Sequence, residues 1–160
     1  MSAYHDLLSK EEITQSSYSL GIVHDNERLA RVLLSPKHYR NGSIVATAFE
    51  QIFHPDGFSV LRHGANFESS LQKTIQILET DDNKYIGYVS ANVQDIRMLV
   101  IDSIHRVFIV LDTACSDRLA HADILTTRKT IVSEELSKKF ILNFIRYQIS
   151  ELFNDLSLMN

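Results

Sequence analysis

The unbroken apolar run from Val107 to Leu111 constrains the fold of this chain more than any other part of its sequence. Such a run predicts a strand covered on both faces, because a strand with one solvated face alternates apolar and polar residues. Asp112 ends the run, and His121 and Asp123 follow after a short polar loop. We therefore expect a central strand that brings polar side chains to a place where the core meets solvent.

Further apolar runs, separated by turn signals, indicate an α+β fold. Asn41 and Gly42 mark one turn, because both residues tolerate positive φ, and residues 54–57 mark a second. Gly87 indicates a bulge or a close backbone approach within a strand. The expected strands are residues 27–35, where a helix also fits, 43–49, 58–61, 85–89 and 107–111. The sequence predicts a mixed or antiparallel sheet with helices packed on it.

Apolar residues at helical spacing predict three helices. The first covers residues 67–78 with Asn66 as its cap, and the second follows Ser90 as its cap. The third is a long, C-terminal amphipathic helix over residues 133–156. This helix has enough apolar residues to cover a sheet and still meet a partner, although core packing alone also explains them.

The composition is that of an ordinary globular protein, since the 160 residues are 44% hydrophobic and 22% charged. We expect a single domain over residues 20–160, preceded by a loose arm or short helix over residues 1–19. Cys115 is the only cysteine, so no intramolecular disulfide can form. The sequence shows neither a signal peptide nor an apolar stretch of membrane-spanning length, which predicts a cytoplasmic protein.

The net charge of −4 gives the chain no general attraction to phosphate backbones, so nucleic-acid binding is not expected from the whole sequence. A local exception remains open, because basic residues cluster within one short segment. They are Arg28, Arg31, Lys37, His38 and Arg40. The cluster indicates either a local nucleic-acid site or an ordinary solvated surface.

The pair His121 and Asp123 is the first candidate site. Side chains two residues apart share one face of an extended segment, and Asp112 lies across the loop. A carboxylate beside an imidazole can hold one tautomer and keep the ring basic, as a general base requires. The alternative is that both side chains hydrogen-bond the loop backbone.

Basic side chains near expected strand ends form the second candidate site. Arg62 follows a strand, Arg97 lies in the second helix, and His38 is a further candidate. If these groups converge with His121, they form a pocket for a phosphate or carboxylate; otherwise they are scattered surface residues. No phosphate-binding loop, dinucleotide fingerprint, G-x-S-x-G or zinc motif occurs, so neither a cofactor nor a metal is expected.

Five segments of the chain resemble a family of small uncharacterised bacterial proteins. They are residues 29–38, 48–49, 58–62, 87–97 and 110–124. Members of that family carry S-P-x-H, S-V-x-R and His-Ala-Asp/Asn-Ile motifs, but this chain has Ala114 and Asp117 in a loop where the family usually has prolines. The family has no known activity. The resemblance implies that the matching polar positions form the site: His38, Arg62, Arg97, His121 and Asp123.

Two functions are compatible with these features. The first is a non-catalytic accessory or interaction protein of a bacterial multi-gene system, related to defence or toxins, that binds a protein partner or self-associates through its C-terminal helix. The second is a small hydrolase or transferase for a phosphate-bearing or nucleotide-like substrate. In this alternative Arg62 and Arg97 bind the anion, His121 is the base, Asp123 orients it and His38 is a further catalytic group.

Overall fold

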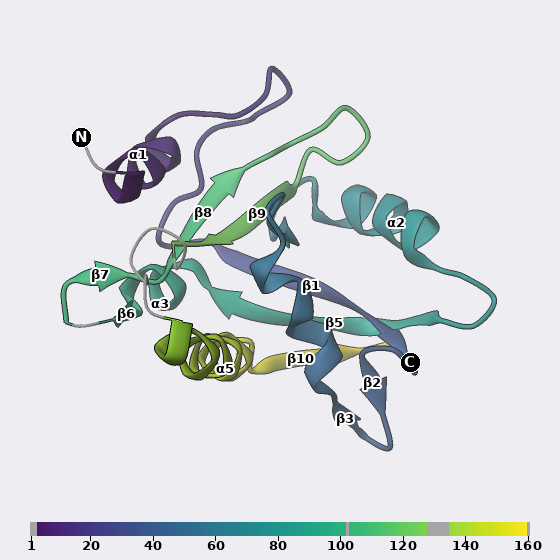
Figure 1. Ribbon diagram of the computed structural model, residues 1–160. Coiled ribbons are helices and arrows are strands. Elements are labelled where there is room, and N and C mark those ends of the chain that lie inside the picture. The colour runs from purple at the N-terminus through teal and green to yellow at the C-terminus, as the bar shows by residue number, and fades with distance from the viewer. Residues whose placement is uncertain (1–2, 102, 128–134, 160) are drawn as a thin grey trace.

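A six-stranded antiparallel sheet forms the centre of the fold (Figure 1). The computed structural model describes residues 3–101, 103–127 and 135–159, in the last range with side chains from residue 142 onward. The strand order is β10-β5-β1-β4-β9-β8. The strands are β1 (Arg28–Ser35), β4 (Phe58–Arg62), β5 (Lys84–Asn92), β8 (Phe108–Asp112), β9 (His121–Thr126) and β10 (Asp155–Leu158). The predicted α+β class is therefore confirmed.

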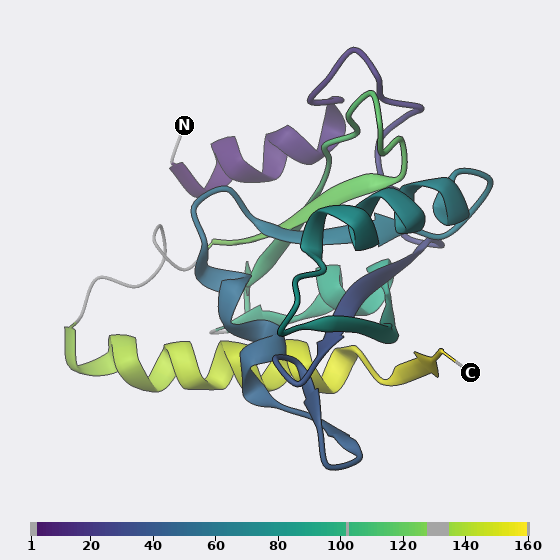
Figure 2. The ribbon, with the colours of Figure 1, turned by 90° about the vertical axis from the view of Figure 1, so that its right-hand side faces the viewer.

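Helices cover both faces of this sheet (Figure 2). The helix α2 (Phe67–Leu78) packs on one face, which we call the α2 face. The opposite face is covered by η2 (Ala46–Phe53), α3 (Val93–Met98) and α5 (Glu135–Leu152). The remaining elements are α1 (Ala3–Ser9), η1 (Lys10–Glu12), β2 (Tyr39–Arg40), β3 (Ser43–Ile44), β6 (Val100–Ile101) and β7 (His105–Arg106). None of the described helices is both long and apolar enough to span a membrane.

Strand alternation divides the buried side chains between two apolar cores. Within β4, Phe58 and Val60 belong to the larger core under η2, α3 and α5, whereas Leu61 belongs to the smaller core under α2. Because successive side chains point to opposite faces, Ser59 shares the α2 face with Leu61, and Arg62 lies on the other face. This alternation decides which polar side chains of the sheet can meet.

The apolar run of β8 lies at one edge of the sheet, so the prediction of a central strand is wrong. All residues of β8 are nevertheless buried, because the N-terminal segment covers the outer edge. The backbone N–H of Val110 donates to Oε2 of Glu11 at 2.8 Å. Arg97 and Arg106 hold the same carboxylate at 2.8 and 2.7 Å. An edge strand covered in this way requires the same apolar sequence as a central strand.

The C-terminal helix ends earlier than predicted. Leu156 lies in β10 instead of α5, and it pairs with Val89 of β5. Within the part of α5 whose side chains are described, Ile145 and Ile149 are fully buried. The long amphipathic helix predicted over residues 133–156 is therefore not shown. The chain leaves the helix to cover what would otherwise be an open sheet edge at β5.

Three further local predictions differ from the structure. Most of the strand predicted over residues 43–49 belongs to the 3-10 helix η2, because Phe49 and Ile52 turn into the larger core. Asn66 precedes α2 without a side-chain capping bond. Ser90 lies inside β5, which continues to the residue before α3, and so it does not cap that helix.

Candidate functional site

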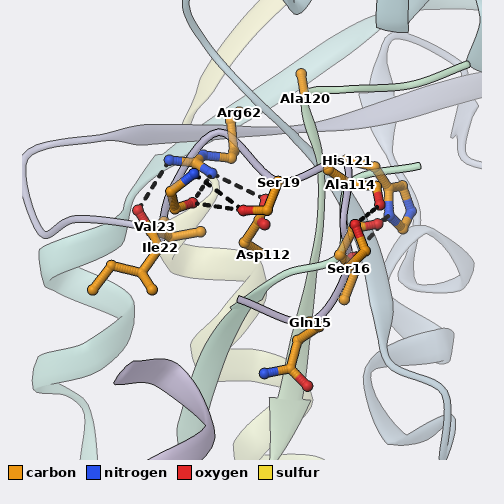
Figure 3. Close-up of polar contacts among 12 residues, drawn as sticks. Gln15, Ser16, Ser19, Ile22, Val23, Arg62, Asp112, Ala114, Ala120 and His121 are labelled. Atoms are coloured by element: carbon orange, nitrogen blue, oxygen red, sulfur yellow. Dashed lines mark hydrogen bonds and ion pairs between the residues drawn. The ribbon is translucent and has the colours of Figure 1, made fainter. Parts of the chain in front are cut away.

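Arg62 is fully occupied by partners within the chain (Figure 3). Its five N–H groups donate to Glu27, Asp112 and the carbonyl oxygens of Gly21 and Ile22, over distances of 2.7 to 3.1 Å. Burial lowers the pKa of Arg62, but the hydrogen bonds and charges of the two carboxylates outweigh burial and raise it above its ordinary value. Arg62 therefore fastens the segment before β1 to the sheet, with no N–H group left for an external anion.

Arg97, the second arginine expected to bind an anion, is also paired internally. Its Nε donates to Glu11 at 2.8 Å, Nη1 donates to Asp25 at 2.8 Å, and Nη2 donates to the carbonyl oxygen of Val23 at 2.8 Å. These bonds tie the N-terminal segment to α3. The geometry of both arginines is that of structural anchors.

The predicted site residues do not form one cluster. The register of β4 and β9 pairs Leu61 with His121, so His121 and Asp123 lie on the α2 face. Arg62 lies on the opposite face of the same strand pair. His38 is placed at the turn that follows β1. The structure thus brings His121 and Asp123 together and separates them from Arg62.

A chain of hydrogen bonds joins His121 to three other polar side chains on the α2 face. Nε2 of His121 lies 2.6 Å from Oγ of Ser59. On the other side of the ring, Nδ1 lies 2.8 Å from Oγ1 of Thr113 and 3.1 Å from the carbonyl oxygen of the same residue. The hydroxyl of Thr113 donates to Oδ2 of Asp123 at 2.8 Å. We call this series the relay: it runs from the hydroxyl of Ser59 through His121 and Thr113 to the carboxylate of Asp123.

The surroundings of His121 favour a neutral ring with its proton on Nδ1. Burial lowers the pKa of His121, and the charge of Asp123 offsets only part of that effect. Nδ1 faces the carbonyl oxygen of Thr113, which can only accept a hydrogen bond, so Nδ1 is the donor. Nε2 is then an acceptor and receives the hydroxyl hydrogen of Ser59. This arrangement is the one that a general base requires at neutral pH.

A cavity of about 130 Å³ opens between β1 and β4, beside α2 and η2. It exists because these strands pair only at Leu29 with Arg62 and at Ala30 with Leu61, and then separate. We name it the Arg31 cavity. Its polar lining residues are Arg31, Lys37, His38, Gln51, Ser59, Thr74 and Arg118, without an aspartate or glutamate. The cavity therefore has an excess of positive charge.

Arg31 is buried without a carboxylate partner. The residue is only 6% exposed, and its guanidinium carbon lies 4.2 Å above the ring centre of Phe58. Nη1 donates to the carbonyl oxygen of Ser59 at 2.9 Å and Nη2 donates to Gln51 at 3.2 Å, whereas Nε has no partner. Among the described residues no carboxylate forms an ion pair with it. Desolvation lowers the pKa of Arg31 to about 10, although the charge of Asp123 opposes the shift.

His38 adds a neutral donor to the same cavity. It is 5% exposed, and its Nδ1 accepts a hydrogen bond from the backbone N–H of Leu34 at 3.0 Å. Burial, together with the charges of Arg31 and Lys37, lowers the pKa of His38 to about 4. The ring is therefore neutral at pH 7, and its proton lies on Nε2.

Sequence reasoning missed the roles of Ser59 and Thr113 and placed Arg31 only in a basic cluster. Arg31 carried a usable signal, because it interrupts an otherwise apolar strand. Within the part of the chain that the structure describes, no three His, Cys, Asp or Glu residues are grouped to hold a metal ion. Comparison with known protein families, with curated proteins and with solved structures found no match.

Proposed function

We propose that the protein binds a small molecule through a phosphate or carboxylate group in the Arg31 cavity. The observation behind this proposal is the buried Arg31 guanidinium, which stacks on Phe58 and donates hydrogen bonds only to neutral oxygens. A buried charge without a counter-ion is costly, and Arg62 and Arg97 each have carboxylates around them. A bound anion would supply the missing counter-charge and use donors that remain free.

The other groups around the Arg31 cavity support an anion over a cation or an apolar ligand. Lys37 and Arg118 add positive charge, and His38 adds a neutral N–H donor. A volume of about 130 Å³ suits one anionic group of a small molecule and not a macromolecular surface. The basic cluster at residues 28–40 does not form one outward surface, because Arg31 and His38 are buried.

Thermal unfolding in the presence of inorganic phosphate or acetate tests the proposal. Phosphate at about ten times its Kd should stabilise the protein by about 1.4 kcal/mol, which raises Tm by roughly 3–6 °C. Arg31→Gln should abolish this shift, and Arg31→Lys should retain part of it. Arg40→Gln removes the same charge from an exposed position outside the cavity and serves as the matched control.

The proposed anion site at Arg31 is contradicted if neither phosphate nor acetate shifts Tm at matched ionic strength. A shift that Arg31→Gln and Arg40→Gln reduce equally would also contradict it, because general charge and not the cavity would then be responsible. Chloride at the same ionic strength measures that general effect.

The role of a non-catalytic accessory or interaction protein stays a prediction with its own test. Apolar side chains on the outer strand β10 support it, since Leu156 and Leu158 are 40% and 44% exposed. On α5, Tyr147 is 60% exposed. Light scattering after size-exclusion chromatography measures the oligomeric state. A dimer that Leu156→Glu dissociates would support self-association, and a monomer at high concentration would contradict it.

A further inference from the structure

We propose that Ser59 is a nucleophile activated by His121, and that the protein hydrolyses a carboxylic ester whose anionic group occupies the Arg31 cavity. The anionic character of the ester rests on the proposed function, whereas the nucleophile stands on separate contacts. In this proposal the hydrolase alternative keeps His121 and Asp123, and Arg31 takes the place of Arg62 and Arg97 as the anion-binding group.

The contact between Ser59 and His121 has the geometry of a nucleophile and its general base. The 2.6 Å between Oγ and Nε2 is within hydrogen-bond reach, so the hydroxyl proton has an acceptor at hand. The opposite ring nitrogen is held by Thr113, whose hydroxyl is fixed in turn by Asp123. The hydroxyl of Ser59 comes from β4, His121 and Asp123 come from β9, and Thr113 between them lies in the loop after β8. Catalytic arrangements of this kind are recognised by geometry and not by order in the sequence.

The nucleophile and the anion-binding group are neighbours. Nη1 of Arg31 donates to the backbone carbonyl oxygen of Ser59 at 2.9 Å, and both residues line the Arg31 cavity. An anion paired with Arg31 therefore lies beside the residue that bears the reactive hydroxyl. This proximity would position an ester carbon of the same molecule near Oγ.

The reaction has two balanced halves. In the first, the Ser59 hydroxyl proton moves to Nε2 of His121 while Oγ bonds to the ester carbon, and the leaving alcohol then takes that proton. In the second, a water molecule gives one proton to Nε2, its hydroxyl bonds to the acyl carbon, and Oγ leaves with the proton from His121. The products are an alcohol and a carboxylic acid, and the enzyme is regenerated.

The chain offers a matched control, a second serine–histidine pair. Oγ of Ser90 lies 2.8 Å from Nε2 of His63. Ser90 is only 2% exposed, and the ring of His63 stacks on Phe67 with 4.4 Å between ring centres. Within the described residues, no hydroxyl or carboxylate forms a hydrogen bond with Nδ1 of His63, and Asp155 acts on the ring only through its charge. This pair has the serine–histidine contact without the remaining parts of the relay.

Labelling with a fluorophosphonate probe tests the nucleophile directly. Oγ of Ser59 attacks the phosphorus and displaces fluoride, so intact mass spectrometry shows the addition of one phosphonyl group and peptide mapping locates it. We expect labelling at Ser59 in the wild type and in Ser90→Ala, and none at this position in Ser59→Ala. His121→Gln should slow labelling by roughly 10²–10⁴-fold. The wild-type rate should also fall as His121 becomes protonated at acidic pH.

Ester hydrolysis then separates the two proposals. The p-nitrophenyl monoester of succinic acid should be hydrolysed with a higher kcat/KM than the neutral p-nitrophenyl acetate, and Arg31→Gln should remove that preference. Labelling without such a preference would leave Ser59 as the nucleophile and overturn the anionic substrate. Stabilisation by phosphate without labelling of Ser59 would overturn the nucleophile alone. Equal labelling rates in the wild type and His121→Gln at every pH would likewise overturn it.

Discussion

At the scale of single residues, the protein treats its buried arginines in opposite ways. Arg62 and Arg97 are surrounded by carboxylates and carbonyl oxygens, which compensate the charge on burial. Arg31 is more deeply buried, stacks on Phe58 and donates hydrogen bonds only to neutral oxygens. The first two positions gain stability from their partners, whereas Arg31 retains a charge that a ligand can use.

His38 gives a pH dependence whose sign follows from its surroundings. Its folded-state pKa of about 4 lies below the ordinary 6.5, so the unfolded chain binds its proton first as pH falls. The contribution of His38 is therefore complete above pH 6.5 and is lost between pH 6.5 and 4, by about 3 kcal/mol over the whole window. Urea unfolding at pH 7.5 and 4.5 measures the change.

His38→Asn is the variant that isolates this contribution, because the Asn oxygen can accept the bond from Leu34 without titrating. The free energy of unfolding should fall less with acidification in the variant than in the wild type. His63 and His121 also have lowered pKa values and leave a residual slope of the same sign. Identical slopes in the two proteins would contradict the assignment to His38.

At the scale of elements, local sequence patterns predicted whether several segments form a helix or a strand. They did not predict where each strand lies in the sheet. The helix over residues 67–78 is confirmed, because its apolar residues recur at helical spacing. Residues 27–35, whose pattern fitted a strand or a helix, form a strand. The run at Val107 predicted burial, but burial cannot distinguish a central strand from a covered edge. Leu156 fits the helical spacing of α5 and lies in a strand, since helix ends depend on tertiary partners.

The same reasoning explains how much of the site could be predicted. His121 and Asp123 share a face because of the two-residue period of a strand, which a single segment reveals. The meeting of Ser59 with His121 depends on the register between β4 and β9, and no local pattern in either segment specifies that register. The Arg31 cavity depends on the separation of β1 from β4, which is likewise a property of two strands.

Gly87 is the residue on which the pairing of β10 with β5 depends. It has φ of +152°, and a Cβ atom there would overlap the carbonyl oxygen of Ser157 and crowd Cα of Leu158. Gly87→Ala should lower the free energy of unfolding by roughly 1–3 kcal/mol and increase hydrogen exchange in β10. Gly42→Ala, at φ of +82° with open space around it, is the control for backbone strain alone. Equal losses of unfolding free energy in the two variants would show that the close approach of β10 to Gly87 contributes nothing to the effect.

At the scale of the whole molecule, the sheet separates a structural face from the face with the candidate site. On the side of η2, α3 and α5, the larger core and the arginine ion pairs hold the N-terminal segment in place. On the α2 face, the relay from Ser59 to Asp123 lies beside the smaller core. The Arg31 cavity opens in the gap between β1 and β4, with lining residues from both α2 and η2. Substitutions in the relay should therefore reduce the rate of the proposed ester hydrolysis more than they reduce the free energy of unfolding.

The covering of β8 by Glu11 has a consequence for the order in which the protein is assembled. The bond from Val110 to Glu11 spans 99 positions of the chain, and the bond from Arg97 to Glu11 spans 86. A ribosome makes Glu11 long before it has made the strand against which this residue rests. During synthesis Glu11 therefore stays without these two partners until Arg97 and Val110 have left the ribosome.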